Sequence, residues 1–242
     1  MIRFFRNIRQ QLLGEGKTGK YLKYAIGEII LVVIGILIAL QFNNWNERVK
    51  NDAETKEILQ AIHSEFVLNK ENLKTTIAGH EFCYRHVEEL IEMFPIKVDQ
   101  VNMDSLRTQA LNSLGQWTFE PTQSRLKYLI SSPYFGMIKD KELQTALLSW
   151  ESTYEDYQEE EQKATDYNNE ILFPYLNTKF PFAIEFSDPR YDRAILQSFE
   201  FENMFKKRKT VLTEILYNDT GELERLNTVM NNIITLTANY IK

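Results

Sequence analysis

An apolar run near the N-terminus constrains the fold of this chain more than any other feature. Residues 29–40 (IILVVIGILIAL) contain no polar side chain, and residues 24–42 are interrupted only by Glu28 and Gln41. A helix rises 1.5 Å per residue, so about 19 residues span roughly 28 Å, close to the hydrocarbon thickness of a bilayer. The run therefore predicts one transmembrane helix over residues 23–43.

The residues that flank this run predict its depth and orientation. Tyr21 and Tyr24 at one end and Trp45 at the other are typical of interfacial anchors. Six basic side chains precede or begin the run, and we expect them to contact the inner leaflet: Arg3, Arg6, Arg9, Lys17, Lys20 and Lys23. By the positive-inside rule, residues 1–22 form a basic amphipathic cytoplasmic tail, and residues 44–242 form a domain outside the cytoplasm.

Two other interpretations of the run are open. A cleaved signal peptide is one, although no small-x-small pair follows the run, because Leu37 stands two positions before Ala39. A buried core helix of a soluble protein is the other, and the flanking charges and aromatic residues argue against it. The tail itself either lies on the inner leaflet, with Ile2, Phe5 and Ile8 on one face, or is disordered.

The composition of the rest of the chain favours long helices and argues against nucleic-acid binding. The chain has 28 basic and 34 acidic residues, and residues 1–40 hold six of the basic ones but only two acids, so the remainder is strongly acidic. Phosphate contacts require Lys and Arg, which makes this domain a poor partner for nucleic acid. Cys83 is the only cysteine, so no internal disulfide can form.

Apolar periodicity divides residues 44–242 into helical segments. We expect a long helix over 46–94 that continues from the membrane helix, short helices over 104–114 with Asp104 as N-cap and over 121–131, a helix from the N-cap Asp140 to Leu172, a loop with a short strand over 174–188, and helix from 189 to the end with a kink at Gly221. The last segment carries a heptad-like seam with one charged member, Asp219: Leu212, Leu216, Asp219, Leu223, Leu226, Met230, Ile233 and Thr237. The predicted fold is all-α, with one N-terminal transmembrane helix followed by an elongated antiparallel helical bundle.

Four residues of the membrane helix are candidates for contact with another helix. Gly27, Gly35 and Ala39 lie on similar faces, and small residues let helix backbones approach closely. Glu28 is a carboxylate about one turn inside the cytoplasmic boundary, where it either contacts a partner helix, acts as a proton site, or is an interfacial glutamate favoured by the helix dipole.

The motifs that resemble catalytic or metal sites lack the geometry that such chemistry needs. His80-x-x-Cys83-x-x-His86 cannot converge on one ion from a regular helix, because positions 80 and 86 differ by about 240°. The acidic run of residues 151–161 lacks the glycine and spacing of a calcium loop and is interpreted as a solvated helix face. Gly14-x4-Gly19-Lys20 lacks the Ser or Thr of a phosphate loop. We therefore expect no catalytic residues, no cofactor and no metal.

The stretch YAIGEIILVVIGILIALQFNNWNE, from Tyr24 to Glu47, resembles the signature of a family of uncharacterised inner-membrane proteins of Gram-negative bacteria. The preceding FFRNIRQQLL and KTGKYLKYAIGE resemble the opening of that family, and Leu126–Trp150 resembles its L-x-S-x-G-x-x-x-I-x-D-x-x-L segment, with Ser132-Pro133 in place of Ser-Gly. The resemblance implies an inner-membrane protein with a cytoplasmic N-terminus and a periplasmic C-terminal domain. It implies no activity.

These features together favour a non-enzymatic scaffold or interaction protein. Its partners would be the lipid bilayer and either a second copy of itself or another membrane protein. Two alternatives come from other classes: an ion-coupled, stator-like membrane component that uses Glu28, and a periplasmic sensor that acts through a partner.

Overall fold

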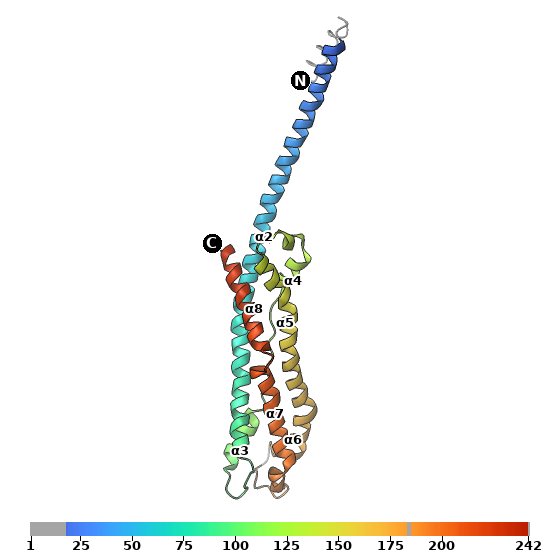
Figure 1. The fold of residues 1–242 in the computed structure, drawn as a ribbon. Coiled ribbons are helices and arrows are strands. Elements are labelled where there is room, and N and C mark those ends of the chain that lie inside the picture. The colour runs from blue at the N-terminus through green and yellow to red at the C-terminus, as the bar shows by residue number, and fades with distance from the viewer. Residues whose placement is uncertain (1–17, 183–184, 242) are drawn as a thin grey trace. The chain divides into compact units, whose positions relative to one another are not determined.

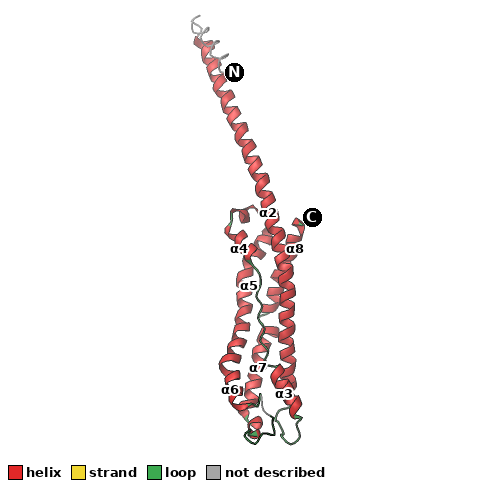
Figure 2. Ribbon diagram, turned by 180° about the vertical axis from the view of Figure 1, so that it is seen from behind, coloured by secondary structure: helices red, strands yellow, loops and turns green. Residues whose placement is uncertain are grey.

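The structure is a computed structural model that describes residues 18–182 and 185–241, and in this part of the chain every regular element is a helix (Figure 2). The chain divides into two compact units, Met1–Thr55 and Lys56–Lys242. One helix, α2 (Thr18–Glu92), belongs to both units. The predicted continuation of the apolar segment into the following helix is therefore confirmed. The helix can continue because no proline occurs before Pro95 to interrupt it.

The second unit contains the remaining helices, whose order along the chain can be followed by colour in Figure 1. They are α3 (Met103–Asn112), α4 (Ser124–Ser131), the 3-10 helix η1 (Pro133–Met137), α5 (Lys141–Asp166), the π-helix η2 (Tyr167–Leu172), α6 (Phe173–Lys179), the 3-10 helix η3 (Arg193–Gln197), α7 (Phe199–Tyr217), α8 (Glu222–Thr237) and the 3-10 helix η4 (Ala238–Tyr240).

Side-chain caps explain where two of these helices begin. The carboxylate of Asp140 accepts hydrogen bonds from the backbone N–H groups of Glu142 and Leu143, which confirms the predicted start of α5. The predicted cap of α3 is wrong, because the side chain of Asn102 accepts the bond from Ser105 N and Asp104 lies inside the first turn. There Asp104 still stabilises the helix through the macrodipole.

The predicted end of the α5 segment at Leu172 is also wrong, because helical structure continues through Pro174 to Lys179. The π-helix η2 lies directly before the proline, and Phe173 N donates to Asn168 O, five residues back. A π-turn adds one residue to the helical repeat, so the chain accommodates a residue that has no N–H to donate. The predicted strand over 174–188 is absent from the described residues of that range.

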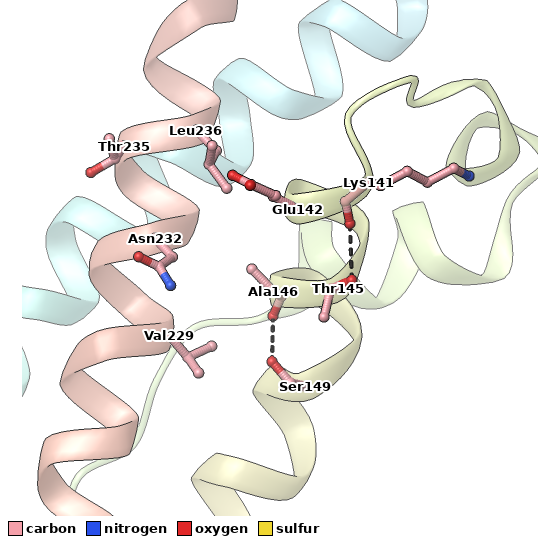
Figure 3. A pocket seen from close by; sticks show the side chains of 9 residues that line it. All are labelled: Lys141, Glu142, Thr145, Ala146, Ser149, Val229, Asn232, Thr235 and Leu236. Atoms are coloured by element: carbon pink, nitrogen blue, oxygen red, sulfur yellow. Dashed lines mark hydrogen bonds between the residues drawn. The ribbon is translucent and has the colours of Figure 1, made fainter.

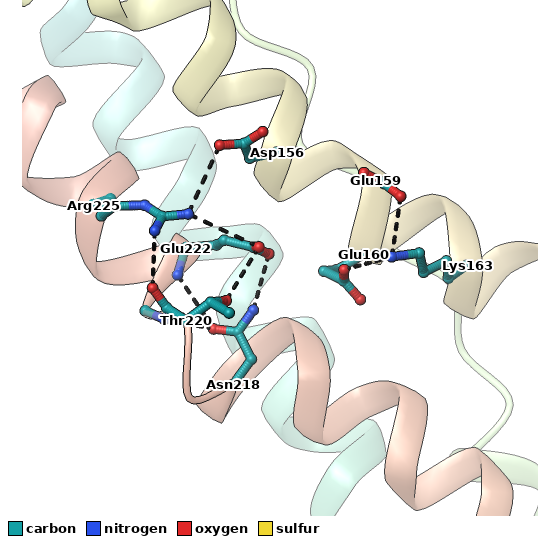
Figure 4. Close-up of polar contacts among 9 residues, drawn as sticks. Asp156, Glu159, Glu160, Lys163, Asn218, Thr220, Glu222 and Arg225 are labelled. Carbon is teal, nitrogen blue, oxygen red and sulfur yellow. Dashed lines mark hydrogen bonds and ion pairs between the residues drawn. The ribbon is translucent and has the colours of Figure 1, made fainter.

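The predicted kink at Gly221 is a full break between α7 and α8. Gly221 has φ 68°, in the left-handed region that glycine adopts most readily. The side-chain oxygen of Asn218 accepts hydrogen bonds from the backbone N–H groups of Gly221 and Glu222. These bonds satisfy the first donors of α8 and fix the turn (Figure 4).

Helices α7 and α8 run antiparallel to the part of α2 that lies in the second unit. Nδ1 of His63 lies 3.1 Å from Ile234 O, and 25 residues later along α2 a Glu88–Lys209 ion pair of 2.7 Å joins the same two layers. Residue numbers thus rise along α2 as they fall along α8 and α7, and the ribbons lie side by side in both views (Figures 1 and 2).

Helix α5 runs parallel to α2 and completes the core. The rings of Phe66 and Trp150 meet edge to face at 4.7 Å, and His80 contacts Glu161 further along both helices. The apolar stripes of α2, α5, α7 and α8 all point into one cluster of buried side chains. Six of the eight residues of the C-terminal seam are buried, Leu223 is half-buried, and Asp219, in the turn between α7 and α8, is exposed. Burial of this kind provides most of the stability of a helical domain.

Because α2 and α5 are parallel, the chain must return along the domain between them, and it does so through the extended segment 113–123, which we call the strap. Trp117 of the strap lies flat against α2 at Gly79. A Cβ built on Gly79 would stand 2.2 Å from Cδ2 of Trp117, so only glycine permits this approach.

Because Trp117 lies so close to Gly79, the effect of Gly79→Ala on stability should be opposite in sign to the usual one. In an ordinary helix interior, Gly→Ala raises stability by up to about 1 kcal/mol. Here we expect Gly79→Ala to lower the free energy of unfolding by about 1–3 kcal/mol, because the indole must be displaced. Chemical denaturation of the full chain in mild detergent measures the change.

The matched variant is the double substitution Gly79→Ala/Trp117→Ala. With the indole removed, the added methyl has open space, and adding Gly79→Ala to Trp117→Ala should be neutral or stabilising. If Gly79→Ala destabilises equally in both backgrounds, the contact with Trp117 is not the reason that glycine occupies this position.

Candidate functional site

The described part of the chain has one helical segment long and apolar enough to cross a membrane, and its own chain leaves it uncovered. This segment of α2 has a mean hydropathy of 2.5 and none of its window is buried. The large apolar side chains between Leu22 and Phe42 are 47% to 68% exposed. Soluble proteins rarely expose so large an apolar surface, so this segment is a candidate contact with lipid or with another protein.

The four predicted helix-contact residues lie within this uncovered segment. A Cβ added at Gly27 or Gly35 would meet nothing within 4 Å, so the described chain supplies no neighbour that requires glycine at these two positions. Ala39 is exposed and Glu28 is half-buried. Glu28 is the only charged residue between Lys23 and Glu47.

The predicted anchors and basic contacts are only partly described. Tyr24 and Trp45 are 52% and 56% exposed, and Lys23 is exposed. Lys20 and Tyr21 belong to α2, and nothing is described of their side chains. The remaining basic residues lie outside the described residues: Arg3, Arg6, Arg9 and Lys17.

A second distinctive feature is a cluster of buried polar side chains that bind the backbone of the strap. Arg208 on α7 is 2% exposed, and its guanidinium donates to Ser113 O at 3.0 Å and to Gly115 O at 2.7 Å. Burial lowers the pKa of Arg208 to about 10, so the group remains charged at neutral pH. Asn168 on η2 donates to the neighbouring carbonyl of Leu114.

The middle of the strap is held by a buried carboxylate. Glu161 on α5 is 1% exposed; its Oε1 lies 3.1 Å from Nε2 of His80, and its Oε2 accepts from Phe119 N at 2.8 Å. The hydroxyl of Tyr154 donates to Phe119 O. The end of the strap is held by Asn69, whose amide exchanges two hydrogen bonds with the backbone of Thr122.

Together these bonds give the backbone of an irregular segment the partners that a helix or a sheet would otherwise supply. The acidic run of residues 151–161 is therefore not wholly a solvated face, and the interpretation is wrong for Glu161. The sequence does contain a signal for the burial of Glu161, namely its position in the helical repeat. Glu161 follows the apolar stripe of Trp150, Tyr154 and Tyr157 at three- and four-residue steps, and Arg208 follows Phe201 and Phe205 in the same way. A charged residue at a stripe position indicates a buried polar contact.

The hydrogen bonds of the buried cluster are typical of a structural element. Its one thiol, Cys83, is not activated as a nucleophile. Burial raises the pKa of the Cys83 thiol, which donates to Gly115 O, so the unreactive protonated form predominates at neutral pH. His80, Cys83 and His86 contact different partners. His80 contacts Glu161, Cys83 donates to Gly115 O, and His86 is hydrogen-bonded to Gln109 of α3. Among the described residues, no three His, Cys, Asp or Glu side chains are placed to hold a metal ion.

A groove of about 620 Å³ lies between the start of α5 and the end of α8 (Figure 3). The two hydroxyl groups on its α5 side are engaged by their own helix, since Thr145 donates to Lys141 O and Ser149 to Ala146 O, and Thr235 of α8 also lines the groove. Neither of the two α5 hydroxyls is paired with a base, as a nucleophile would be.

The surface further along α5 is linked by ion pairs (Figure 4). Arg225 of α8 lies 3.7 Å from a carboxylate oxygen of Asp156, and Lys163 pairs with Glu159 and Glu160 along α5 itself. These pairs are exposed, so each contributes little to stability. They make a solvated charged surface, as predicted for most of the acidic run.

Comparisons with known proteins give a family match. No curated protein matches the chain. No solved structure matches it either. The family described as "Family of unknown function (DUF6090)" matches residues 28–159, which include Glu28, the whole apolar run of residues 29–40, the strap and Trp150. This match covers more than half of the chain, and the protein therefore belongs to the DUF6090 family.

Proposed function

We propose that this protein is a non-enzymatic, membrane-anchored scaffold or interaction protein of the bacterial inner membrane. Its tail, residues 1–22, lies in the cytoplasm, residues 23–43 cross the membrane, and residues 44–242 display a helical bundle in the periplasm. The protein associates with itself through the membrane helix.

One observation carries this proposal: the long apolar segment of α2 has no cover from the described chain. Lipid would cover most of it, and Tyr24 and Trp45 would lie at the two interfaces. The lysines and arginines before the segment would hold that end in the cytoplasm. The buried polar groups support a structural role for the domain, because they bind the strap and leave no nucleophile beside a base.

The proposed self-association is tested by enlarging the small residue at the centre of the contact face. Gly35→Leu would prevent close approach of two helices, and we expect the dimer fraction in mild detergent or native membranes to fall roughly tenfold. Val33→Leu, on the other side of the helix, is the matched control and should leave the dimer fraction unchanged. A protein that is strictly monomeric and recovers no partner after cross-linking would contradict the proposal.

A second candidate function rests on Glu28, the only charged residue between Lys23 and Glu47. A carboxylate at this depth is costly unless it contacts protein, water or a cation, and an ion-coupled, stator-like component would use it to carry a proton. Under this candidate, Glu28→Gln abolishes the biological activity and leaves dimerisation intact. Retention of activity by Glu28→Gln would exclude it.

A further inference from the structure

The helix α2 carries an apolar face that starts at the end of the predicted membrane segment, residues 23–43, and continues into the residues that follow. Phe42, Trp45 and Val49 are 68%, 56% and 50% exposed, and the rings of Phe42 and Trp45 contact each other at 5.8 Å along the helix. Polar and charged residues surround these three positions in the sequence. An exposed aromatic and aliphatic face on a helix in water is typical of a protein contact.

The helical geometry places the apolar residues of this stretch on one side. At about 100° per residue, one sector about 120° wide contains the following residues: Phe42, Trp45, Asn46, Val49 and Ala53. All charged residues between positions 42 and 54 lie outside that sector: Glu47, Arg48, Lys50, Asp52 and Glu54. Gly35 and Ala39 lie in the same sector further back, so the face continues from the proposed contact within the membrane.

We propose that a second copy of this chain docks on this face, as a parallel pair that extends the membrane contact to Ala53. The inference rests on the proposed self-association and names its partner and its extent. Two copies in one membrane share the same topology and depth, so Phe42 meets Phe42 and Trp45 meets Trp45 across a two-fold axis. The polar Asn46 within an apolar seam would fix the register of the pair.

The charges beside the face favour a second copy over an unrelated partner. Lys50 and Asp52 flank the sector on opposite sides, at about 80° from its centre in each direction. In a parallel pair, the two-fold axis places Lys50 of one copy on the same side as Asp52 of the partner subunit, with an axial offset of about 3 Å. The pairing occurs twice, and the axis places the two copies of Lys50 on opposite sides, as it does the two copies of Asp52.

A cysteine scan tests the face directly, and the chain suits it because Cys83 is buried and is the only native thiol. Single substitutions Phe42→Cys, Trp45→Cys and Val49→Cys are compared in native membranes with Asn44→Cys, Glu47→Cys and Asn51→Cys on the opposite side. We expect disulfide-linked dimers to form at least about five-fold faster at the first three positions. Equal rates at all six positions, or faster rates at the control positions, would overturn the inference.

Charge exchange tests the orientation and the identity of the partner. Lys50→Asp and Asp52→Lys should each lower the yield of the Trp45→Cys dimer about three- to five-fold, since each places like charges together. The double variant Lys50→Asp/Asp52→Lys should restore the yield, and Glu47→Lys should not change it. A double variant no better than the single variants would contradict the parallel pairing.

Positions within the membrane separate this inference from the proposed function. If Ile38→Cys forms dimers and the three outer positions form none, the extended pairing is wrong and self-association within the membrane stands. If no position forms dimers and the outer positions instead join a different protein, the second copy is the wrong partner, although an interaction role stands. If no position forms any adduct, both fail.

Discussion

Replacing Arg208 with methionine should lower the free energy of unfolding by about 3–5 kcal/mol. The methionine side chain is similar in length and apolar, so the loss of packing is small. The buried carbonyl group of Ser113 loses its guanidinium donor, and the carbonyl group of Gly115 keeps only the weak thiol donor of Cys83. A buried acceptor without a partner keeps the full cost of its desolvation, which explains the size of the effect.

The matched control is Lys207→Met, which removes a neighbouring exposed cation from the same helix. A surface substitution of this kind changes stability by about 0.5 kcal/mol or less. Both variants are compared with the unaltered chain by urea denaturation in mild detergent, followed by circular dichroism. If Arg208→Met lies within 1 kcal/mol of its control, the guanidinium does not hold the strap.

Glu161→Met should lower the free energy of unfolding by a similar amount, about 3–5 kcal/mol, because it leaves His80 Nε2 and Phe119 N without their buried acceptor. Glu161→Gln keeps one acceptor oxygen and the volume of the side chain, so its loss should be smaller, about 1–3 kcal/mol. Two residues earlier on the same helix, Glu159 is exposed and pairs only with Lys163.

Glu159→Met is therefore the control for Glu161, and it should change the unfolding free energy by less than about 1 kcal/mol. The comparison separates the buried carboxylate from the acidic run to which it belongs. Equal effects at positions 159 and 161 would mean that the run acts as one solvated face and that Glu161 has no structural role.

The sequence predicts the helices of this protein better than it predicts their connections. The apolar stripes of α2, α5 and α8 repeat every three to four residues over long stretches, so their existence and their buried faces follow from local information. The start of α5 follows from one capping side chain, Asp140. Local patterns do not reveal how a π-turn before Pro174 allows the helix to continue, because the proline alone predicts an end.

The contacts between the strap and its buried partners could not be predicted from local sequence patterns for a different reason. Arg208 lies more than ninety residues from the carbonyls of Ser113 and Gly115, and Glu161 lies 42 residues from Phe119. Nothing within a few residues of either side chain specifies these contacts. The membrane segment is the opposite case, since its apolar run alone predicts its contact with lipid, and the exposure of the run in the folded chain supports that prediction.

The central claim is that the apolar segment of α2 is a permanent anchor that holds the helical domain on the periplasmic side. Protease protection of a tag fused after Lys242 tests this claim most directly, combined with alkaline extraction and N-terminal sequencing of the mature chain. We expect the protein to remain with the membrane at alkaline pH, to keep residues 24–42, and to lose the tag only to protease added from the periplasmic side. A tag that is cut only from the cytosolic side, or a mature chain that begins after Phe42, would contradict it.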